Sequence, residues 1–307
     1  MKCPLCKNMN NFEYLESKID FEMNLEYKIY KCLDCELEFS EPMEPAPSFH
    51  YEKFEWYFER WEFKETLKFF YNKKVKILEI GCGEGYFLNL AKKKGFDVFG
   101  IDFNKKAIKV AKEKFGVEKV YPYTLEEFME KFPNEKFDIV CFFHLLEHLE
   151  DPLNFMKNIK KILKEDGYIV FSLPNPKRFS LYFNLREGWD FPPHHLTRWN
   201  EKSLNKLLNI TGFELIKKED EPLKIKEILG IIMVKMSFGV IKKLSDKESV
   251  VSINSDIKKE KKILINILKE IKKIILYPIA FYSFLKLKKK GVTGQSMLII
   301  ARRKNEY

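Results

Sequence analysis

The sequence predicts an α/β protein with a Rossmann-like, doubly wound sheet of seven strands, a small N-terminal module and a helical insertion before the last strand. Three observations support this fold class. Short apolar runs alternate with helical segments from residue 74 onward, as in parallel sheets covered by helices on both faces. A glycine-rich turn follows the first of these runs. Two Cys-x-x-Cys pairs stand close to the N-terminus.

Composition and charge exclude several protein classes. The 307 residues are 45% hydrophobic and 33% charged, which is typical of a globular chain and not of a collagenous or disordered one. No basic segment leads into an apolar run at the start, so we expect no secretory signal. No run reaches the ~20 apolar residues of a membrane span. We therefore expect a cytoplasmic protein.

The N-terminal module, residues 1–40, is predicted to be a zinc ribbon. It contains two knuckle-spaced pairs separated by 25 residues, namely Cys3, Cys6, Cys32 and Cys35. Four thiolates can surround Zn²⁺ tetrahedrally and leave no open position, so the metal is expected to be structural. Redox centres or two disulfides are the alternatives. The alternating apolar residues between the pairs predict a hairpin too small to form a core without metal.

Residues 41–71 are predicted to form a linker and an aromatic helix. Pro42, Pro45 and Pro47 indicate a stiff connection. An aromatic, helix-like stretch follows over 49–71. Some of its rings are expected in the core, and others are expected to cap a ligand pocket.

The main domain is predicted over 72–220 plus 295–307. The chain alternates between the two kinds of element, with strands at Val75–Ile80, Phe96–Ile101, 117–121, Phe137–Phe142 and Tyr168–Ser172, and helices at 86–94, 104–115 and 152–164. In such a sheet the ligand lies at the carboxyl ends of the strands, near the switch in strand order.

The turn after the first strand indicates which ligand is bound. It reads Glu79-x-Gly81-x-Gly83-x-Gly85, but Tyr86 stands where a dinucleotide fingerprint requires glycine. The Lys-Ser/Thr ending of a phosphate loop is also missing. Glycines let the backbone approach a ligand closely. Asp102, at the end of the second strand, can accept hydrogen bonds from both hydroxyls of a ribose.

Three segments carry a family resemblance: Leu78–Gly85, Gly100–Asp102 and His144–Pro152. Together they resemble class I S-adenosylmethionine-dependent methyltransferases, most closely the branch related to quinone and sugar methyltransferases, here with an N-terminal zinc ribbon. The segments at 211–219 and 297–302 match the late strands of that fold, the last of which is inserted antiparallel.

The resemblance implies S-adenosylmethionine as cofactor and places its contacts residue by residue. Glu79 and the turn at 81–85 would hold the methionine end, and Asp102 would bind the ribose. The cofactor-binding set implied in this way is Glu79, Gly81, Cys82, Gly83, Gly85, Asp102, Phe103, Thr124, Leu125, Phe143 and His144.

Histidines are expected on the acceptor side of the pocket. Four of the five histidines follow strand ends: His144, His148, His194 and His195. His144 and His148 are four residues apart and would share one face of a helical turn. Imidazole suits a general base near neutral pH. Because the loop with His194 and His195 stands where similar zinc-ribbon sugar C-methyltransferases carry an acidic-His motif, the resemblance implies His195 as the base, with His148 as helper or second base and His194 beside them. Zinc bound by this cluster is an alternative.

The acceptor itself is left open by the sequence. Zinc-ribbon sugar C-methyltransferases carry an acidic-His motif in the loop where this chain has Pro192–Trp199, and the acidic residue is missing from it. Transfer to carbon and transfer to oxygen therefore both remain, on a small or lipid-linked molecule of sugar, quinone or polysaccharide-precursor type.

Two other functions are alternatives. Ribosomal RNA methyltransferases also pair a zinc ribbon with this fold, but their second knuckle usually reads Cys-to-His, whereas Cys32-x-x-Cys35 is all cysteine. We do not expect nucleic acid as a partner. The other alternative is an interaction protein whose methyltransferase fold has lost its chemistry. The glycine turn, Asp102 and the histidines favour an enzyme.

The excess positive charge lies in the insertion at 221–294. Residues 221–290 hold 17 Lys and 7 Asp or Glu, a net charge of 17 − 7 = +10, which equals that of the whole chain. Apolar blocks flanked by lysines suit peripheral contact with the inner face of a membrane. A cap over the site and a dimer interface are the alternatives, and the oligomeric state stays open.

Overall fold

The computed structural model of the protein describes residues 1–47, 59–71, 74–183, 188–244 and 274–304. The predicted aromatic positions at 49–58 lie outside the described residues. Two compact units are present. The first unit comprises Met1–Pro176, Leu185–Glu221 and Ser296–Tyr307, and the second comprises Lys177–Asn184 and Pro222–Gln295.

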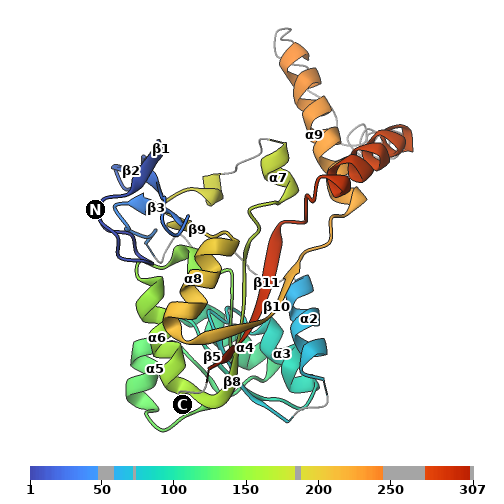
Figure 1. Ribbon diagram of the computed structural model, residues 1–307. Coiled ribbons are helices and arrows are strands. Elements are labelled where there is room, and N and C mark those ends of the chain that lie inside the picture. Colours follow the sequence, from blue (N-terminus) through green and yellow to red (C-terminus); the bar gives the residue numbers. More distant parts are fainter. Residues whose placement is uncertain (48–58, 72–73, 184–187, 245–273, 305–307) are drawn as a thin grey trace. The chain divides into compact units, whose positions relative to one another are not determined.

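A seven-stranded sheet forms the centre of the first unit (Figure 1). Its strands are β4 (Lys76–Ile80), β5 (Asp97–Ile101), β6 (Val120–Tyr121), β7 (Phe137–Phe143), β8 (Leu163–Pro174), β10 (Phe213–Asp220) and β11 (Ser296–Arg303). They are arranged in the order β10-β11-β8-β7-β4-β5-β6. β11 runs antiparallel to both of its neighbours, whereas β4 to β8 pair in parallel. This sheet confirms the predicted fold class.

Helices cover both faces of the sheet (Figure 1). Each of them packs against it through buried apolar residues. On one face lie α2 (Trp61–Phe69), α3 (Tyr86–Lys93) and α4 (Lys105–Phe115). On the other face lie α5 (Leu125–Lys131), α6 (Pro152–Ile162) and α8 (Glu201–Thr211). In α6, Leu153, Met156 and Ile159 recur at helical spacing and are buried. Fully burying each such side chain contributes about 1.5–3 kcal/mol.

Local capping sets the ends of these helices. The Asn104 side chain accepts hydrogen bonds from the N–H groups of Lys106 and Ala107 at the start of α4, and Gly116 ends that helix with φ 59°. Because the chain turns into β8 directly after Ile162, α6 is two residues shorter than the predicted helix at 152–164.

A second, four-stranded sheet belongs to the N-terminal module, and of the four cysteines only Cys32 lies in one of its strands. β1 (Phe12–Asp20) and β2 (Leu25–Cys32) form the hairpin between the two cysteine pairs, and β3 (Glu38–Glu41) follows. Its fourth strand, β9 (Thr197–Arg198), comes from the segment between β8 and α8. The N-terminal module therefore shares a sheet with the segment that carries the late histidines.

Residues 41–47 extend this contact. The N–H of Ser40 donates to the carbonyl of Leu196, and the N–H of Ala46 donates to that of Pro193, each at 2.9 Å. The proline-containing stretch is therefore held against residues 193–196, which include His194 and His195, instead of spanning open space as a linker.

The second unit is helical in its described part. It contains α7 (Phe179–Tyr182), α9 (Ile225–Leu244) and a helix at residues 274–289. A small cluster of Ile228, Leu229, Leu276, Ala280 and Leu287 forms its buried core. Among the described residues, no helix is both long enough and apolar enough to cross a membrane.

Candidate active site

The glycine turn lies at the carboxyl end of β4, between β5 and β7, where the order of the parallel strands switches. Gly83 and Gly85 have φ of 48° and 76°, values that disfavour other residues. A Cβ on Gly85 would come within 2.9 Å of the Ala111 Cβ, whereas one on Gly83 would meet nothing within 4 Å. The turn is thus packed against α4 on one side and open on the other.

Asp102 holds this turn in place. Its Oδ2 accepts a hydrogen bond from the N–H of Gly83, and its Oδ1 accepts one from the N–H of Asn104, both at 2.8 Å. Each carboxylate oxygen has a second lone pair for a further donor. Burial raises the pKa of Asp102, against the effect of these two hydrogen bonds.

Glu79 lies one residue before the end of β4, and the residue is 4% exposed. Its Oε2 has no hydrogen-bond partner among the described residues. Burial, followed by the negative charge of Asp102, raises its pKa well above the usual range, although Arg60 acts in the opposite direction. A buried carboxyl oxygen without a donor is a ready acceptor for a positively charged ligand.

The other residues predicted to bind the cofactor have mixed surroundings. Phe103 is 49% exposed beside Asp102, and Cys82 is buried in the turn. The Thr124 side chain accepts a hydrogen bond from the N–H of Glu127 and so caps α5, while Leu125 is 4% exposed in the core. Phe143 packs edge-on against two core rings. Contributions to ligand binding from Thr124, Leu125 and Phe143 stay predictions.

His144 follows the last residue of β7, and the expectation that it shares a helical turn with His148 is wrong. Its φ of 50° lies outside the helical region, and only Leu146–His148 form a short 3₁₀ turn, η1. The ring instead lies between two buried carboxyl groups. Nε2 is 3.1 Å from Oε1 of Glu62 in α2, and Nδ1 is 3.3 Å from Oε1 of Glu147.

Charges around His144 compensate one another. Burial favours the neutral ring, but hydrogen bonds to Glu147 and Glu62 raise the pKa of His144. Burial likewise opposes the ionisation of Glu147, yet His144 and the two neighbouring histidines hold its pKa at about 2. Arg60 interacts electrostatically with Glu62, Glu147 and Glu79. The Arg60 guanidinium thus connects Glu147, which lies between His144 and His148, with the Glu79 carboxyl group beside the glycine turn.

Glu147, His148 and His195 come together at the end of η1. Their ligand atoms all lie within 4.8 Å of one another. The ring centroids of His148 and His195 are 4.9 Å apart, edge to face. Nδ1 of His148 lies 2.7 Å from the carbonyl oxygen of His194, and a carbonyl can only accept, so this nitrogen carries the proton. Burial lowers the pKa of His148 to about 4.

Asp190 is the residue that sequence reasoning missed. Its Oδ1 lies 3.3 Å from Nδ1 of His195, and the side chain is buried. The acidic group absent from the motif at 192–199 is thus supplied five residues before His195. Its signal in the sequence is the lone acidic residue of Gly188-Trp189-Asp190. Arg60 and Glu62 belong to no sequence motif, so nothing in the sequence indicated them. They reach the site only because α2 packs beside it.

The four N-terminal cysteines converge on one point. Sγ of Cys3 and Sγ of Cys35 are 3.6 Å apart, and those of Cys6 and Cys32 are 3.5 Å apart. All four sulfurs lie within 4.8 Å of one another. These separations exceed a disulfide bond of ~2.05 Å, but they approach the ~3.8 Å that tetrahedral coordination at ~2.3 Å from zinc requires. The four cysteines therefore fit a zinc ion.

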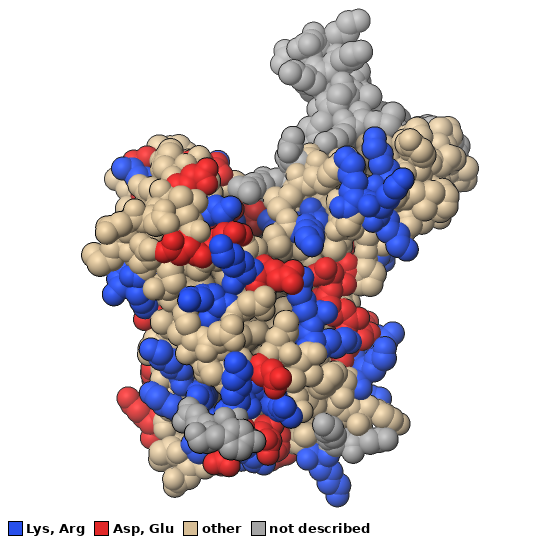
Figure 2. Space-filling view, viewed as in Figure 1, with Lys and Arg blue, Asp and Glu red and all other residues tan. Residues whose placement is uncertain are grey.

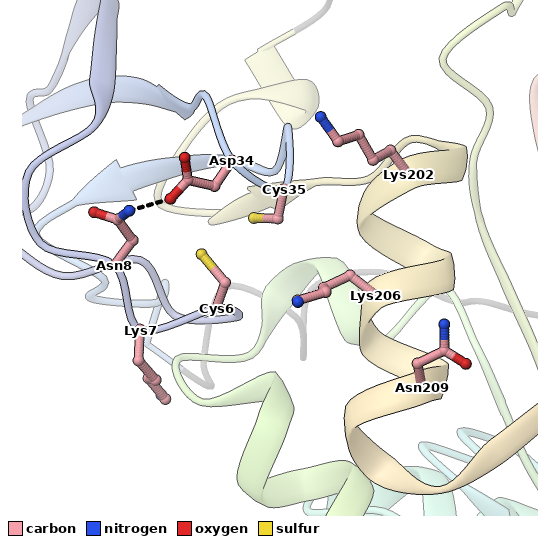
Figure 3. A pocket seen from close by; sticks show the side chains of 8 residues that line it. All are labelled: Cys6, Lys7, Asn8, Asp34, Cys35, Lys202, Lys206 and Asn209. Carbon is pink, nitrogen blue, oxygen red and sulfur yellow. Dashed lines mark hydrogen bonds between the residues drawn. The ribbon is translucent and has the colours of Figure 1, made fainter.

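Both knuckles have the same backbone form. The residue after each pair, Lys7 and Glu36, has positive φ of 62° and 60°. Its N–H donates to the carbonyl of the first cysteine of the pair. Figure 3 shows Lys202 and Lys206 of α8 extending from one wall of a cavity of about 580 Å³ beside Cys6 and Cys35. Four thiolates around Zn²⁺ would carry a net charge of −2, which these lysines would offset.

Comparison with known proteins agrees with this geometry. The model of a methyltransferase domain family matches residues 54–218, which is more than half of the chain. The chain belongs to this methyltransferase family. Among curated relatives, the ubiquinone biosynthesis O-methyltransferase of Actinobacillus pleuropneumoniae is 36% identical over 107 residues, covering 33% of this chain and 46% of that one. A probable S-adenosylmethionine-dependent methyltransferase of Mycobacterium tuberculosis is 30% identical over 139 residues, covering 45% and 48%.

The chain spans about half the length of these curated relatives. Among solved structures, an S-adenosylmethionine-dependent methyltransferase from Archaeoglobus fulgidus is similar to it, with 24% identity and a TM-score of 0.49. That similarity covers 78% of this chain and 90% of that one.

The residues at the glycine turn fit S-adenosylmethionine, the cofactor of this family. The cofactor has a sulfonium and an ammonium group, and Oε2 of Glu79, which has no hydrogen-bond partner in the described part of the chain, is a buried acceptor for positive charge. Asp102 keeps lone pairs for ribose hydroxyls. The open side of the turn at Gly83 leaves room for the ligand.

Proposed function

We propose that this protein is an S-adenosylmethionine-dependent methyltransferase that transfers a methyl group to a small molecule, with His195 as general base. The observation that carries the proposal is the pairing of His195 with Asp190 beside Glu147 and His148. Leu145 lies 3.7 Å from where a Cβ on Gly81 would be, so the cofactor turn adjoins the segment that carries Glu147 and His148, against which His195 lies.

Bound S-adenosylmethionine supplies an electrophilic methyl group on a sulfonium sulfur. The protein has to align the acceptor with that methyl group and remove the acceptor's proton. A carboxylate beside Nδ1 of His195 favours the tautomer with the proton on that nitrogen. The lone pair of Nε2 then receives the proton from the acceptor, and Asp190 stabilises the resulting imidazolium.

His148 suits a supporting role. With a pKa of about 4 it is neutral at physiological pH, and so weak a base removes a proton less efficiently than an imidazole with a pKa near 7. Its Nδ1 proton is donated to the His194 carbonyl, which fixes the ring against that of His195. His194 contributes this carbonyl, so we give its ring no part in the proton transfer.

The names of the relatives support an oxygen acceptor. Ubiquinone biosynthesis O-methyltransferases are named for an aromatic, quinone-type pathway. A hydroxyl on such a ring, on a sugar or on a polysaccharide precursor would give up its proton to a histidine. Methyl transfer to a carbon atom of the same small or lipid-linked class of acceptor is the second candidate reaction. Asp190 supplies the carboxyl group that the loop at 192–199 lacks relative to the acidic-His motif of sugar C-methyltransferases.

We further propose that one structural zinc ion binds Cys3, Cys6, Cys32 and Cys35. The matching backbone conformation of the two cysteine knuckles and the neighbouring lysines support this assignment. A zinc ion held by Glu147, His148 and His195 is the alternative, which the grouping of their ligand atoms keeps open.

Calorimetry and a methyl-transfer assay test the enzyme. The protein should bind S-adenosylmethionine and S-adenosylhomocysteine, and transfer labelled methyl to a member of a panel of catechols, quinols and nucleotide sugars. His195→Ala should lower kcat by about 10²–10⁴-fold with cofactor affinity unchanged, whereas His194→Ala should have a much smaller effect. Failure to bind either cofactor form would favour a non-catalytic protein. Full turnover in His195→Ala would remove the base from the mechanism.

A further inference from the structure

The helix at 274–289 in the second unit buries only one face. Leu276, Ala280 and Leu287 are 4%, 0% and 2% exposed and pack in the small core with Ile228 and Leu229 of α9. Their spacing of four and seven residues places them on one stripe of the helix.

The opposite face is apolar as well. A helix at a protein surface normally presents polar residues to water, and one that is apolar all round is buried or in contact with lipid. Here large apolar side chains point outward, with exposed fractions from 44% to 74%: Ile274, Ile275, Tyr277, Ile279, Phe281, Tyr282 and Leu285. A contiguous apolar surface of this kind marks an interaction site.

Lysines follow this apolar stretch directly. Lys286, Lys288, Lys289 and Lys290 are all exposed, and residues 274–295 contain no Asp or Glu. Figure 2 shows blue lysine side chains gathered beside an uncharged tan surface on this part of the second unit. Positive charge without compensating acid next to an apolar face matches the headgroups and acyl chains of an anionic bilayer. A second copy of this basic chain would instead bring like charges together.

The dimensions agree with surface binding. The apolar stretch at 274–285 would extend about 18 Å along the helix axis, well short of a hydrocarbon core of about 30 Å. No described helix meets the requirements for a span. A helix of this length and character lies in the plane of the interface.

We propose that the helix at 274–289 docks on an anionic membrane surface, with Phe281, Tyr282 and Leu285 inserted between headgroups and the four lysines at 286 and 288–290 bound to their phosphates. This goes beyond the proposed methyl transfer and does not rest on it.

Sedimentation of the full-length protein with vesicles tests the proposal. Binding is expected to phosphatidylcholine vesicles that contain phosphatidylglycerol, and to be weak without it. Replacing the four lysines by Gln should lower partitioning by several hundred-fold, at about fivefold per lysine. Phe281→Glu with Tyr282→Glu should abolish it. Phe21→Glu, at an 89% exposed apolar position of the first unit, is the matched control and should bind like wild type.

A spectroscopic variant shows which segment makes the contact. Tyr282→Trp should gain an emission component that shifts to the blue with phosphatidylglycerol vesicles and is quenched by brominated acyl chains, relative to the four native tryptophans. Circular dichroism establishes that each variant is folded, and the lysine variant keeps the test usable if the Phe281→Glu, Tyr282→Glu protein does not fold.

Three outcomes would overturn the proposal. These are no wild-type binding to anionic vesicles, equal binding by the lysine variant, and no vesicle response of the Tyr282→Trp emission. If light scattering showed that Phe281→Glu converts a dimer into a monomer while wild type ignored vesicles, the face would belong to a second copy of this chain.

Discussion

At the residue scale, the first unit gathers buried acidic side chains near the carboxyl ends of the central strands. Glu62, Glu79 and Glu147 are each at most 4% exposed. His144 and Arg60 partly neutralise them, but Oε2 of Glu79 keeps no hydrogen-bond partner among the described residues. Such an arrangement is expensive in the ligand-free protein and becomes favourable when a cation binds.

The ribose contact is tested at Asp102. Asp102→Ala removes charge-assisted hydrogen bonds of about 1.5–3 kcal/mol, so affinity for S-adenosylmethionine should fall by roughly 10–100-fold in calorimetry. Asp97→Ala is the matched control, because Asp97 begins the same strand and is paired with Lys119 on the surface. Unchanged affinity in Asp102→Ala would mean that the ligand sits elsewhere.

The pH dependence of the free energy of unfolding tests the cost of burying the Glu79 carboxylate. Burial raises its pKa in the folded state, so the fold binds a proton more tightly than the unfolded chain and loses stability as pH rises above about 4. Glu79→Gln removes this penalty. The ligand-free variant should be more stable than wild type at pH 8, by about 1–3 kcal/mol in denaturant titrations, with the difference narrowing toward pH 4.

The same variant should bind S-adenosylmethionine more weakly, since its amide cannot pair with a cation. If Glu79→Gln were instead less stable than wild type at pH 8, the ionised carboxylate would be satisfied by Arg60, and the role given to its free oxygen would be wrong.

Asp190 is expected to position His195 and not to contact the acceptor. Asp190→Asn should lower kcat by about 10–100-fold and leave KM and cofactor affinity nearly unchanged, because the amide supports the wrong tautomer. The double variant with His195→Ala should be no slower than His195→Ala alone. A further loss in the double variant would show that Asp190 acts independently of His195.

At the element scale, β9 joins two parts that the sequence separates. It pairs with β3 of the N-terminal sheet, while the N–H of Leu196 donates to the carbonyl of Glu147. The segment that carries His194 and His195 is therefore held between the cysteine module and η1. Unfolding of the N-terminal cysteine module should therefore make the position of His195 less well defined, while the glycine turn stays intact.

Metal removal tests this coupling. Elemental analysis should find one zinc per chain, and Cys3→Ser with Cys6→Ser should release it. Cofactor affinity should survive, but kcat should fall by about tenfold or more, because small misplacements of a catalytic group are costly. Cys141→Ala, at a buried cysteine of β7, should keep the zinc. A second zinc that is lost in His148→Ala would favour metal at the histidine cluster, and unchanged kcat in the zinc-free variant would contradict the coupling.

At the whole-molecule scale, charge and ligand binding are assigned to different units. The net charge of +10 equals the excess of lysine at 221–290, whereas the glycine turn and the histidines lie in the first unit. Because no proposed site residue belongs to the second unit, the two units can respond differently to a ligand.

Calorimetric unfolding tests this division. S-adenosylhomocysteine at about 100 times its Kd should stabilise the unit that binds it by about 2.7 kcal/mol. Only the transition of the first unit should move to higher temperature, and Asp102→Ala should remove the shift at the same concentration. A single transition that moves as a whole would show that the two units unfold together.

The strand–helix order, the glycine turn and the cysteine pairs could be predicted from the amino-acid sequence, because periodicity and motif spacing are local properties of the chain. Three contacts became visible only in the folded chain: Asp190 faces His195, Glu62 of α2 meets His144, and β9 completes the N-terminal sheet. These contacts join segments whose own patterns say nothing about each other. Packing of the helices and loops over the sheet determines which side chains meet, and His144 shows the difference. Its spacing from His148 suggested a shared helical turn, but a positive φ and two buried carboxyl groups turn its ring toward α2.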